Sequence, residues 1–335
     1  MKERTIMGIV MMAVFLPVLI MQEMFILFQI MMIGLTLIAS LELIKMYEKK
    51  KKFPGFSKWI IVICTLLIYF AATAEWCRTI DSVNRDVQLQ STGETISYEI
   101  LEILNINVGV LPMLTVCMLL LFSLLVVYRD FDGADIGKAV TVMLYAGVGF
   151  AGLTCLRAVG LRFILYMFII TILTDVFAYL VGSKFGKHKM CPHISPKKSW
   201  EGSIGGTFIA TIFGTLFAVF YGRIFGSIFG PVEAKTLLHY CPFINGNFIS
   251  HLNNLEIVFL LFALTLFTSI CSQLGDLVAS KLKRTYGIKD YGDLFPGHGG
   301  VLDRFDSALF AAMFILSAFM ILAGISTKII GVVGL

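Results

Sequence analysis

Long apolar runs follow one another along almost the whole chain. Each is close to the roughly 20 residues that an α-helix needs to cross the hydrocarbon core of a bilayer. The runs do not alternate between apolar and polar positions, which argues against the strands of a transmembrane barrel. The pattern therefore predicts an all-α polytopic membrane protein with about nine transmembrane helices. The predicted spans are Ile6–Met21, Met24–Tyr47, Trp59–Trp76, Gly109–Tyr128, Ala139–Leu156, Arg162–Gly182, Ile204–Tyr221, Leu255–Gly275 and Asp306–Ile325.

The positions of lysine and arginine predict the orientation of these helices. Nine alternating spans place the two termini on opposite sides of the membrane. Of the 27 basic residues, 20 then fall on the side of the N-terminus and 7 on the other side. Basic residues are concentrated in cytoplasmic loops. We therefore expect an integral membrane protein with its N-terminus in the cytoplasm and its C-terminus outside.

Composition supports a membrane protein and excludes several other classes. Apolar residues make up 58% of the 335 residues and charged residues 15%, whereas soluble domains have about 45–50% and about 25%. This excludes a typical soluble enzyme, a disordered chain and a small disulfide scaffold. The polar residues suggest two regions. We expect N-terminal transmembrane helices over 1–135 and a C-terminal catalytic transmembrane region over 136–335, with cytoplasmic loops at 182–203 and 276–305.

The segment 276–307 carries five aspartates and five basic residues next to the membrane. Carboxylates can hold a divalent cation, and basic side chains can neutralise phosphate oxygens that the metal does not reach. The balance of charges therefore indicates a metal–polyphosphate site, although a solvated loop with balanced charges would look similar. The charged residues are Asp276, Asp290, Asp293, Asp303, Asp306, Lys281, Lys283, Arg284, Lys289 and Arg304.

Helical spacing groups some of these side chains. If the preceding helix continues past Asp276, then Asp276, Ser280 and Lys283 lie on one face. Asp303 and Asp306 are three residues apart at the start of the last span and can also face one way. We expect the two helix ends to converge on a shared cation. Glycines around His298 would allow close backbone approach and leave N–H groups for an anion. These glycines are Gly297, Gly299 and Gly300.

A second polar stretch, 182–206, is basic and contains a single acidic residue, Glu201. Hydroxyl groups beside two lysines indicate phosphate binding, although a basic loop near a membrane can simply contact anionic lipid. The hydroxyl and lysine residues are Ser195, Lys197, Lys198 and Ser199. Upstream, Asp175 lies inside a predicted span. An ionisable group at that depth is costly, so we expect it to be functional or to make a structural polar contact with a neighbouring helix.

These residues resemble those of a known family. Residues Ser280–Asp306 read S-K-L-K-R-x4-K-D-x-G-x2-F-P-G-H-G-G-V-L-D-R-F-D, which looks like the signature of the CDP-diacylglycerol synthases, or phosphatidate cytidylyltransferases. The upstream T-D-V-F-A-Y-L-V-G and S-P-K-K-S-W-E-G-x2-G-G are similar to another stretch of that family. Ser199 stands where threonine is also common. The resemblance covers about residues 174–307, and the N-terminal half matches only as a set of membrane helices.

The resemblance implies that phosphatidate and CTP give CDP-diacylglycerol and pyrophosphate with Mg²⁺, alone or with a second cation. It implies the metal ligands Asp276 and Asp303, followed by Asp306. It also implies a homodimer in the lipid of a bacterial cell membrane, with its active site on the cytoplasmic side and no nucleic-acid partner. The further residues that we expect at the catalytic site are Lys283, Arg284, Lys289, Asp290, His298 and Asp175. Those expected to bind substrate are Ser195, Lys197, Lys198, Ser199, Glu201, Ser280, Gly299, Gly300 and Arg304.

Two other functions remain open at this point. A CTP-dependent enzyme that acts on a prenol-lipid phosphate or a polyprenol would use similar chemistry. A transporter would also carry charge within its helices, but transporters commonly show inverted repeats and broken helices near the midplane. Neither feature is visible in this sequence.

Overall fold

The structure is a computed structural model that describes residues 13, 15–21, 23–86, 108–223, 235–241, 252–294 and 299–333. Within these residues, eight helices are long and apolar enough to cross a membrane, which confirms the predicted all-α polytopic class. The predicted first span, Ile6–Met21, and a possible interfacial helix at Ser97–Leu104 fall largely or wholly outside them. The elements are α2 (Phe25–Tyr47), α3 (Ser57–Asp86), α5 (Val110–Val127), α6 (Gly133–Val142), the π-helix η1 (Met143–Val148), α7 (Gly149–Val159), α8 (Leu161–Phe185), β1 (Lys189–Cys191), β2 (Ser195–Ser199), α9 (Trp200–Val219), the 3₁₀-helix η2 (Leu237–Tyr240), α12 (Asn254–Thr285) and α13 (Leu302–Val333).

The chain forms two compact units, and each is assembled from three separate segments. The first unit consists of Met1–Cys77, Ser97–Ala158 and Val278–Leu309. The second consists of Arg78–Ile96, Val159–Leu277 and Phe310–Leu335. The predicted boundary at residue 135 separated N-terminal helices from the region that carries the polar motifs. It stays a prediction about function. In the structure, the charged segment 276–307 contributes Asp276 to the second unit and its remaining charged residues to the first.

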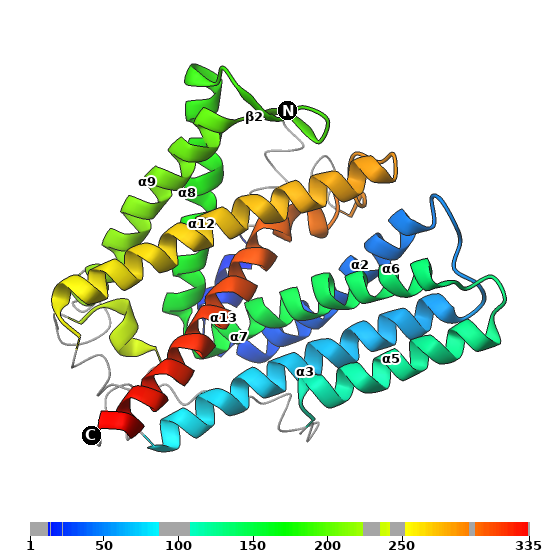
Figure 1. The fold of residues 1–335 in the computed structure, drawn as a ribbon, viewed down its shortest axis with the longest axis horizontal. Coiled ribbons are helices and arrows are strands. Elements are labelled where there is room, and N and C mark those ends of the chain that lie inside the picture. The colour runs from blue at the N-terminus through cyan, green and yellow to red at the C-terminus, as the bar shows by residue number, and fades with distance from the viewer. Residues whose placement is uncertain are drawn as a thin grey trace. The chain divides into compact units, whose positions relative to one another are not determined.

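In the first unit, α3, α5 and the continuous helix formed by α6, η1 and α7 run side by side (Figure 1). Buried polar contacts join these helices, such as the 2.9 Å hydrogen bond between the hydroxyls of Tyr69 and Thr154. One lysine of the Lys49–Lys52 run has partners within the protein. Lys51 pairs with Asp132 at 2.9 Å and Asp135 at 2.6 Å, and these hydrogen bonds raise the pKa of Lys51.

In the second unit, α8 and α9 lie side by side (Figure 1), and small residues form the seam between them. A Cβ added at Gly206 would lie 2.6 Å from the carbonyl oxygen of Thr174 and 2.9 Å from the Cβ of Ala178. Such close approach of two backbones is typical of membrane helices with small interface residues. An antiparallel hairpin, β1–β2, joins the two helices and pairs Lys189 with Ser199. The segment 182–203, predicted as a loop, therefore contains a β-hairpin between two packed helices.

Helix α12 joins this pair through polar contacts between spans. The hydroxyls of Tyr166 and Thr265 share a hydrogen bond of 2.6 Å, and those of Thr174 and Ser269 one of 2.7 Å. Gln273 donates to the hydroxyl of Thr207 at 2.7 Å. Because lipid offers no hydrogen-bond partner, pairing these groups with one another removes the cost of burying them. The contacts hold α8, α9 and α12 in a fixed arrangement.

Helix α12 extends ten residues beyond the predicted end at Gly275 and reaches Thr285. Two residues after its end, Gly287 has a φ of +67°, in the left-handed region that glycine adopts without strain. The last turn before this stop carries Lys283 and Arg284. The helix therefore continues past Asp276, as is required for Asp276 and Lys283 to share one face.

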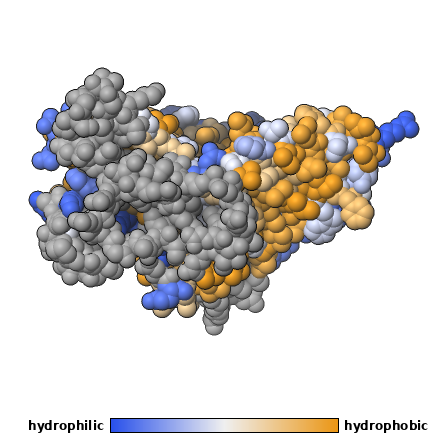
Figure 2. Space-filling view, turned by 90° about the horizontal axis from the view of Figure 1, so that it is seen from below, coloured by the Kyte–Doolittle hydropathy of each residue, from blue (hydrophilic) through white to orange (hydrophobic). Residues whose placement is uncertain are grey.

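Much of the described surface is hydrophobic. Figure 2 shows hydrophobic residues concentrated on the right of that view, where Figure 1 places the ends of α3 and α5. On α5, Leu111, Val126 and Val127 expose 74%, 85% and 71% of their surface. An apolar surface of this kind is expected where a helix faces lipid instead of water.

Candidate functional site

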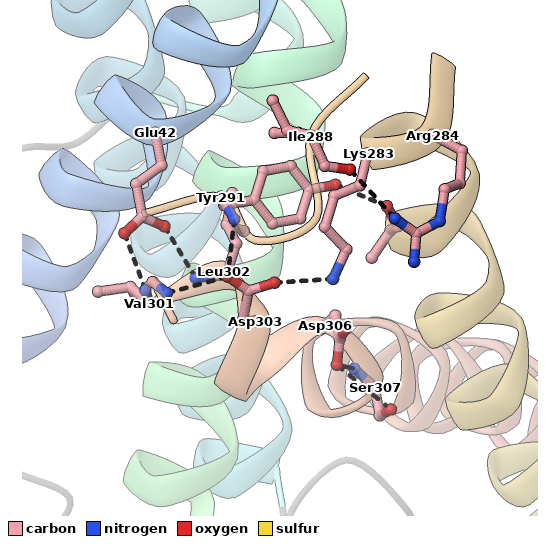
Figure 3. Close-up of polar contacts among 12 residues, drawn as sticks. Glu42, Lys283, Arg284, Ile288, Tyr291, Val301, Leu302, Asp303, Asp306 and Ser307 are labelled. Atoms are coloured by element: carbon pink, nitrogen blue, oxygen red, sulfur yellow. Dashed lines mark hydrogen bonds and ion pairs between the residues drawn. The ribbon is translucent and has the colours of Figure 1, made fainter. Parts of the chain in front are cut away.

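The centre of the first unit's polar cluster is Asp303, in the first turn of α13. Its Oδ1 accepts a hydrogen bond from the ammonium of Lys283 at 2.7 Å (Figure 3). Its Oδ2 accepts the backbone N–H groups of Tyr291 at 2.8 Å and Gly300 at 2.9 Å. The side chain of Asp303 is only 5% exposed and that of Lys283 13%. Two separated parts of the predicted signature therefore meet at one buried carboxylate.

Tyr291 ties the connecting loop to the end of α12. Its ring is buried, and its hydroxyl donates to the carbonyl oxygen of Ala279 at 3.1 Å. The ammonium of Lys283 lies 5.2 Å from the centre of that ring. Burial, together with the neighbouring charges of Asp306 and Asp303, raises the pKa of Tyr291. The phenol therefore stays neutral at ordinary pH and serves as a hydrogen-bond donor that fixes the loop.

Glycine is required beside Asp303 for two reasons. The φ of Gly299 is +85°, in the left-handed region that side chains rarely adopt. A Cβ at Gly299 would also lie 2.8 Å from Oδ2 of Asp303. Close backbone approach was predicted here, with an anion as the partner of the freed N–H groups. In the structure, the N–H of Gly300 is directed at Asp303, so this donor is used within the protein.

Glu42, on α2, belongs to this cluster but was not predicted from the sequence. Its Oε1 and Oε2 accept the backbone N–H groups of Val301 at 2.9 Å and Leu302 at 3.0 Å (Figure 3). Glu42 is 7% exposed and lies 259 and 260 residues before these two partners. A signal was present in the sequence, because Glu42 is an acidic residue within an apolar run, the same feature that singled out Asp175. Its partners could not be deduced from spacing.

In the second unit, the two polar stretches come together at one ion pair. Nζ of Lys198, on β2, lies 2.5 Å from Oδ2 of Asp276, on α12. Asp175, on α8, is exposed in the described chain and lies within electrostatic range of both groups. Three residues predicted for the site therefore belong to one charged group. Ser195 and Lys197 lie on the same strand as Lys198, and the side chain of Lys197 is exposed.

Ser199 and Glu201 have structural partners in the second unit. Ser199 is buried and caps α9 by accepting the N–H of Gly202 at 3.2 Å, a common role for serine before a helix. Glu201 accepts the backbone N–H of His188 at 3.1 Å and contacts its Nδ1 at 2.6 Å. Both residues therefore hold the β-hairpin against α9. Their predicted contact with substrate stays a prediction.

The remaining predicted residues lie around the end of α12 and the start of α13. Arg284 is exposed and donates to the carbonyl oxygen of Ile288 at 3.4 Å. Asp306 accepts the N–H of Ser307 at 2.8 Å. His298 and Gly297 lie outside the described residues. Ser280 is partly buried. Three charged residues are exposed on this surface: Lys289, Asp290 and Arg304.

The carboxylate oxygens of these residues are the type of ligand atom that Mg²⁺ binds. Mg²⁺ prefers oxygen ligands and is commonly held by one or two carboxylates, substrate phosphates and several waters. Asp276 and Asp303 each already have an ammonium group beside one oxygen. A metal ion at either carboxylate would therefore have to share it with a lysine or displace that lysine. Within the part of the chain that the structure describes, no three His, Cys, Asp or Glu residues gather closely enough to hold a metal by themselves.

Comparisons with known proteins agree with the predicted resemblance. Residues 53–322 match the model of the cytidylyltransferase family. A phosphatidate cytidylyltransferase of Staphylococcus haemolyticus is 31% identical over 313 residues, which cover 92% of this chain and 95% of that protein. One from Staphylococcus aureus is 39% identical over 180 residues, and one from Staphylococcus epidermidis is 36% identical over 181. In these two cases the matched segment is 54% of this chain and 57% of the relative, little more than half of its length.

Proposed function

This chain belongs to the cytidylyltransferase family, and we propose that it transfers the cytidylyl group of CTP to phosphatidate. The products would be CDP-diacylglycerol, a precursor for phospholipid synthesis, and pyrophosphate. The observation that carries the proposal is the 31% identity over 92% of the chain to a protein with this name. The bacterial source of the relatives and the apolar helices support a place in a bacterial cell membrane.

In the proposed reaction, a phosphate oxygen of phosphatidate attacks the α-phosphorus of CTP. One oxygen–phosphorus bond forms, and the bond from the α-phosphorus to the oxygen that bridges to the β-phosphate breaks. The electron pair of that bond leaves with pyrophosphate. The lipid phosphate is itself the nucleophile, so no covalent intermediate with the protein is needed. The protein contributes positioning and charge neutralisation, as in other phosphoryl transfers.

The paired lysines are suited to the neutralising role. Lys198 is held by Asp276, and Lys283 is held by Asp303 and lies over the ring of Tyr291. We propose that each ammonium contacts a phosphate oxygen when substrate binds. The carboxylate partners fix the direction of these flexible side chains beforehand, which reduces the entropy lost on binding. Arg284 and Lys289 would add positive charge at the exposed end of α12.

We further propose that Mg²⁺ takes part and that the site faces the cytoplasm. On the sequence motif, Asp276, Asp303 and Asp306 are the proposed ligands. Bound Mg²⁺ would stabilise the charge that develops on the phosphate oxygens and on the leaving pyrophosphate. The resemblance also implies a homodimer, which light scattering of the detergent-solubilised protein would test.

The test is an assay of the purified chain in detergent with CTP, Mg²⁺ and phosphatidate. We expect pyrophosphate release that requires all three, and CDP-diacylglycerol detected by mass spectrometry. Parallel reactions contain ATP in place of CTP, a polyprenol or polyprenyl phosphate in place of phosphatidate, or a chelator. Turnover of the polyprenol compounds without turnover of phosphatidate would refute the proposed lipid substrate. Full activity in the chelator would refute the metal.

A further inference from the structure

We infer that Glu42 is a positioning residue that holds the start of α13 and, through it, Asp303. The inference rests on the proposed function for its catalytic consequence. Glu42 lies in α2, before residue 53, where the family match begins. The carboxylate is nevertheless in direct contact with the signature sequence, at Val301 and Leu302 (Figure 3).

The backbone N–H groups at the start of α13 are bound by carboxylates. The first N–H groups of a helix have no partner within it, and each needs another acceptor. Glu42 accepts those of Val301 and Leu302, and Asp303 accepts that of Gly300. Two carboxylates thus take the N–H groups of three consecutive residues. The backbone that leads into Asp303 is therefore fixed by Glu42 on one side and by Asp303 itself on the other.

Two glycines of the signature pack against the carboxyl group of Glu42. A Cβ added at Gly292 would lie 2.6 Å from Oε1 of Glu42, and one added at Gly300 would also overlap this carboxyl group. Both positions must therefore lack a side chain if Glu42 is to reach the N–H groups. Gly292 follows Tyr291, whose own N–H donates to Asp303. The packing of Glu42 thus reaches both backbone segments that bind Asp303.

An ordinary structural cap is available for comparison in the same unit. Glu75, near the end of the membrane-spanning part of α3, accepts the N–H of Val110 at 2.5 Å, at the start of α5. Both glutamates therefore bind the first turn of another helix from within an apolar span. The two capped helices differ, because the first turn of α13 carries Asp303 and that of α5 is apolar. Loss of Glu75 should affect the helix alone.

The test compares Glu42→Gln with Glu75→Gln in the full-length protein, using phosphatidate and CTP. Glutamine keeps the size of the side chain but sets an amide donor against one of the two N–H groups. We expect Glu42→Gln to lower kcat about tenfold or more, the effect of losing a residue that orients a metal ligand. The KM for CTP should change by less than about twofold. Glu75→Gln should leave kcat unchanged.

Amide hydrogen exchange supplies a readout that does not depend on activity. In Glu42→Gln, peptides that contain Val301 and Leu302 should exchange faster than in the wild type, and in Glu75→Gln only peptides around Val110 should do so. Unchanged exchange at Val301 and Leu302, or a wild-type kcat in folded Glu42→Gln, would overturn the inference. If Glu42→Gln does not fold, Glu42→Asp, which withdraws the carboxylate by one methylene, is measured with the same two criteria. If the wild type fails to use CTP and phosphatidate, the proposed function fails, and the exchange data alone decide whether Glu42 orders this turn.

Discussion

Replacing Gly206 by alanine tests whether the close packing of α8 and α9 is needed at the site. The added Cβ would lie 2.6 Å from the carbonyl oxygen of Thr174 and 2.7 Å from the backbone nitrogen of Ala178. The shorter distance is 0.8 Å below the 3.4 Å at which ordinary contact begins. Both atoms belong to the backbone of α8, so no side-chain rotation can make room. The two helices must therefore separate or tilt.

The expected loss follows from this geometry. Overfilling a packed interface typically costs about 1–3 kcal/mol. Here α8 cannot move away without strain, because the hydroxyl of Thr174 is bonded to Ser269 on α12 at 2.7 Å. A displacement of this size also moves Asp175, the next residue along α8. A misplacement of about 1 Å near reacting groups can reduce turnover about a hundredfold. We expect Gly206→Ala to lose at least about tenfold in kcat as well as stability.

Gly34→Ala is the matched control, because Gly34 is also a helical glycine within a span and its added Cβ would meet no atom within 4 Å. Thermal unfolding of both variants in the same detergent, followed by tryptophan fluorescence, compares their stability. Pyrophosphate release compares their turnover. We expect the melting temperature of Gly206→Ala to fall and that of Gly34→Ala to stay the same or rise slightly, since alanine favours helix. Equal melting temperatures and equal turnover for Gly206→Ala and the wild type would refute the reasoning about the seam.

Three further predictions concern the charged residues and the orientation in the membrane. Asp276→Asn and Asp303→Asn should each abolish pyrophosphate release while the detergent-solubilised protein still elutes as a single species; near-normal turnover in either variant would remove that residue from the proposed metal site. Asp175→Asn should lower turnover at least about tenfold, because the neutral amide no longer interacts with the charges of its neighbours, and unchanged turnover would leave Asp175 with a structural role only. In a variant without native cysteines, a cysteine at position 50 should react with an impermeant maleimide only from the cytoplasmic side and one at position 240 only from outside; labelling of both from the same side would contradict the predicted topology.

The membrane helices could be predicted from the sequence because their apolar lengths are set by the thickness of the bilayer. Their ends could not. Hydropathy detects only the part of a helix in lipid, whereas α12 continues through Lys281 and Lys283 into a polar environment. The β-hairpin was missed because β1 and β2 are three and five residues long, and the prolines and lysines around them show no apolar alternation.

The candidate site was predictable where its contacts are local or belong to one motif. Lys283 and Asp303 lie 20 residues apart in the signature, and the structure brings them together. Lys198 and Asp276 were both singled out, but their pairing depends on how α9 and α12 pack. The contact of Glu42 with Val301 spans 259 residues and leaves no trace in local spacing. Long-range contacts of this kind depend on tertiary packing, which cannot be read from the local spacing of residues in one sequence.

The wide separation of Glu42 from its partners has a consequence for biosynthesis. Chains emerge from the ribosome N-terminal end first, so α8, the β-hairpin and α9 can close on one another while α12 is still being made. Glu42 is inserted far earlier. The N–H groups of Val301 and Leu302 become available only after every described span that precedes α13 has been synthesised. Until then the carboxylate must remain hydrated or bind a temporary partner. The order of synthesis therefore makes the turn that holds Asp303 one of the last parts of the enzyme to assemble.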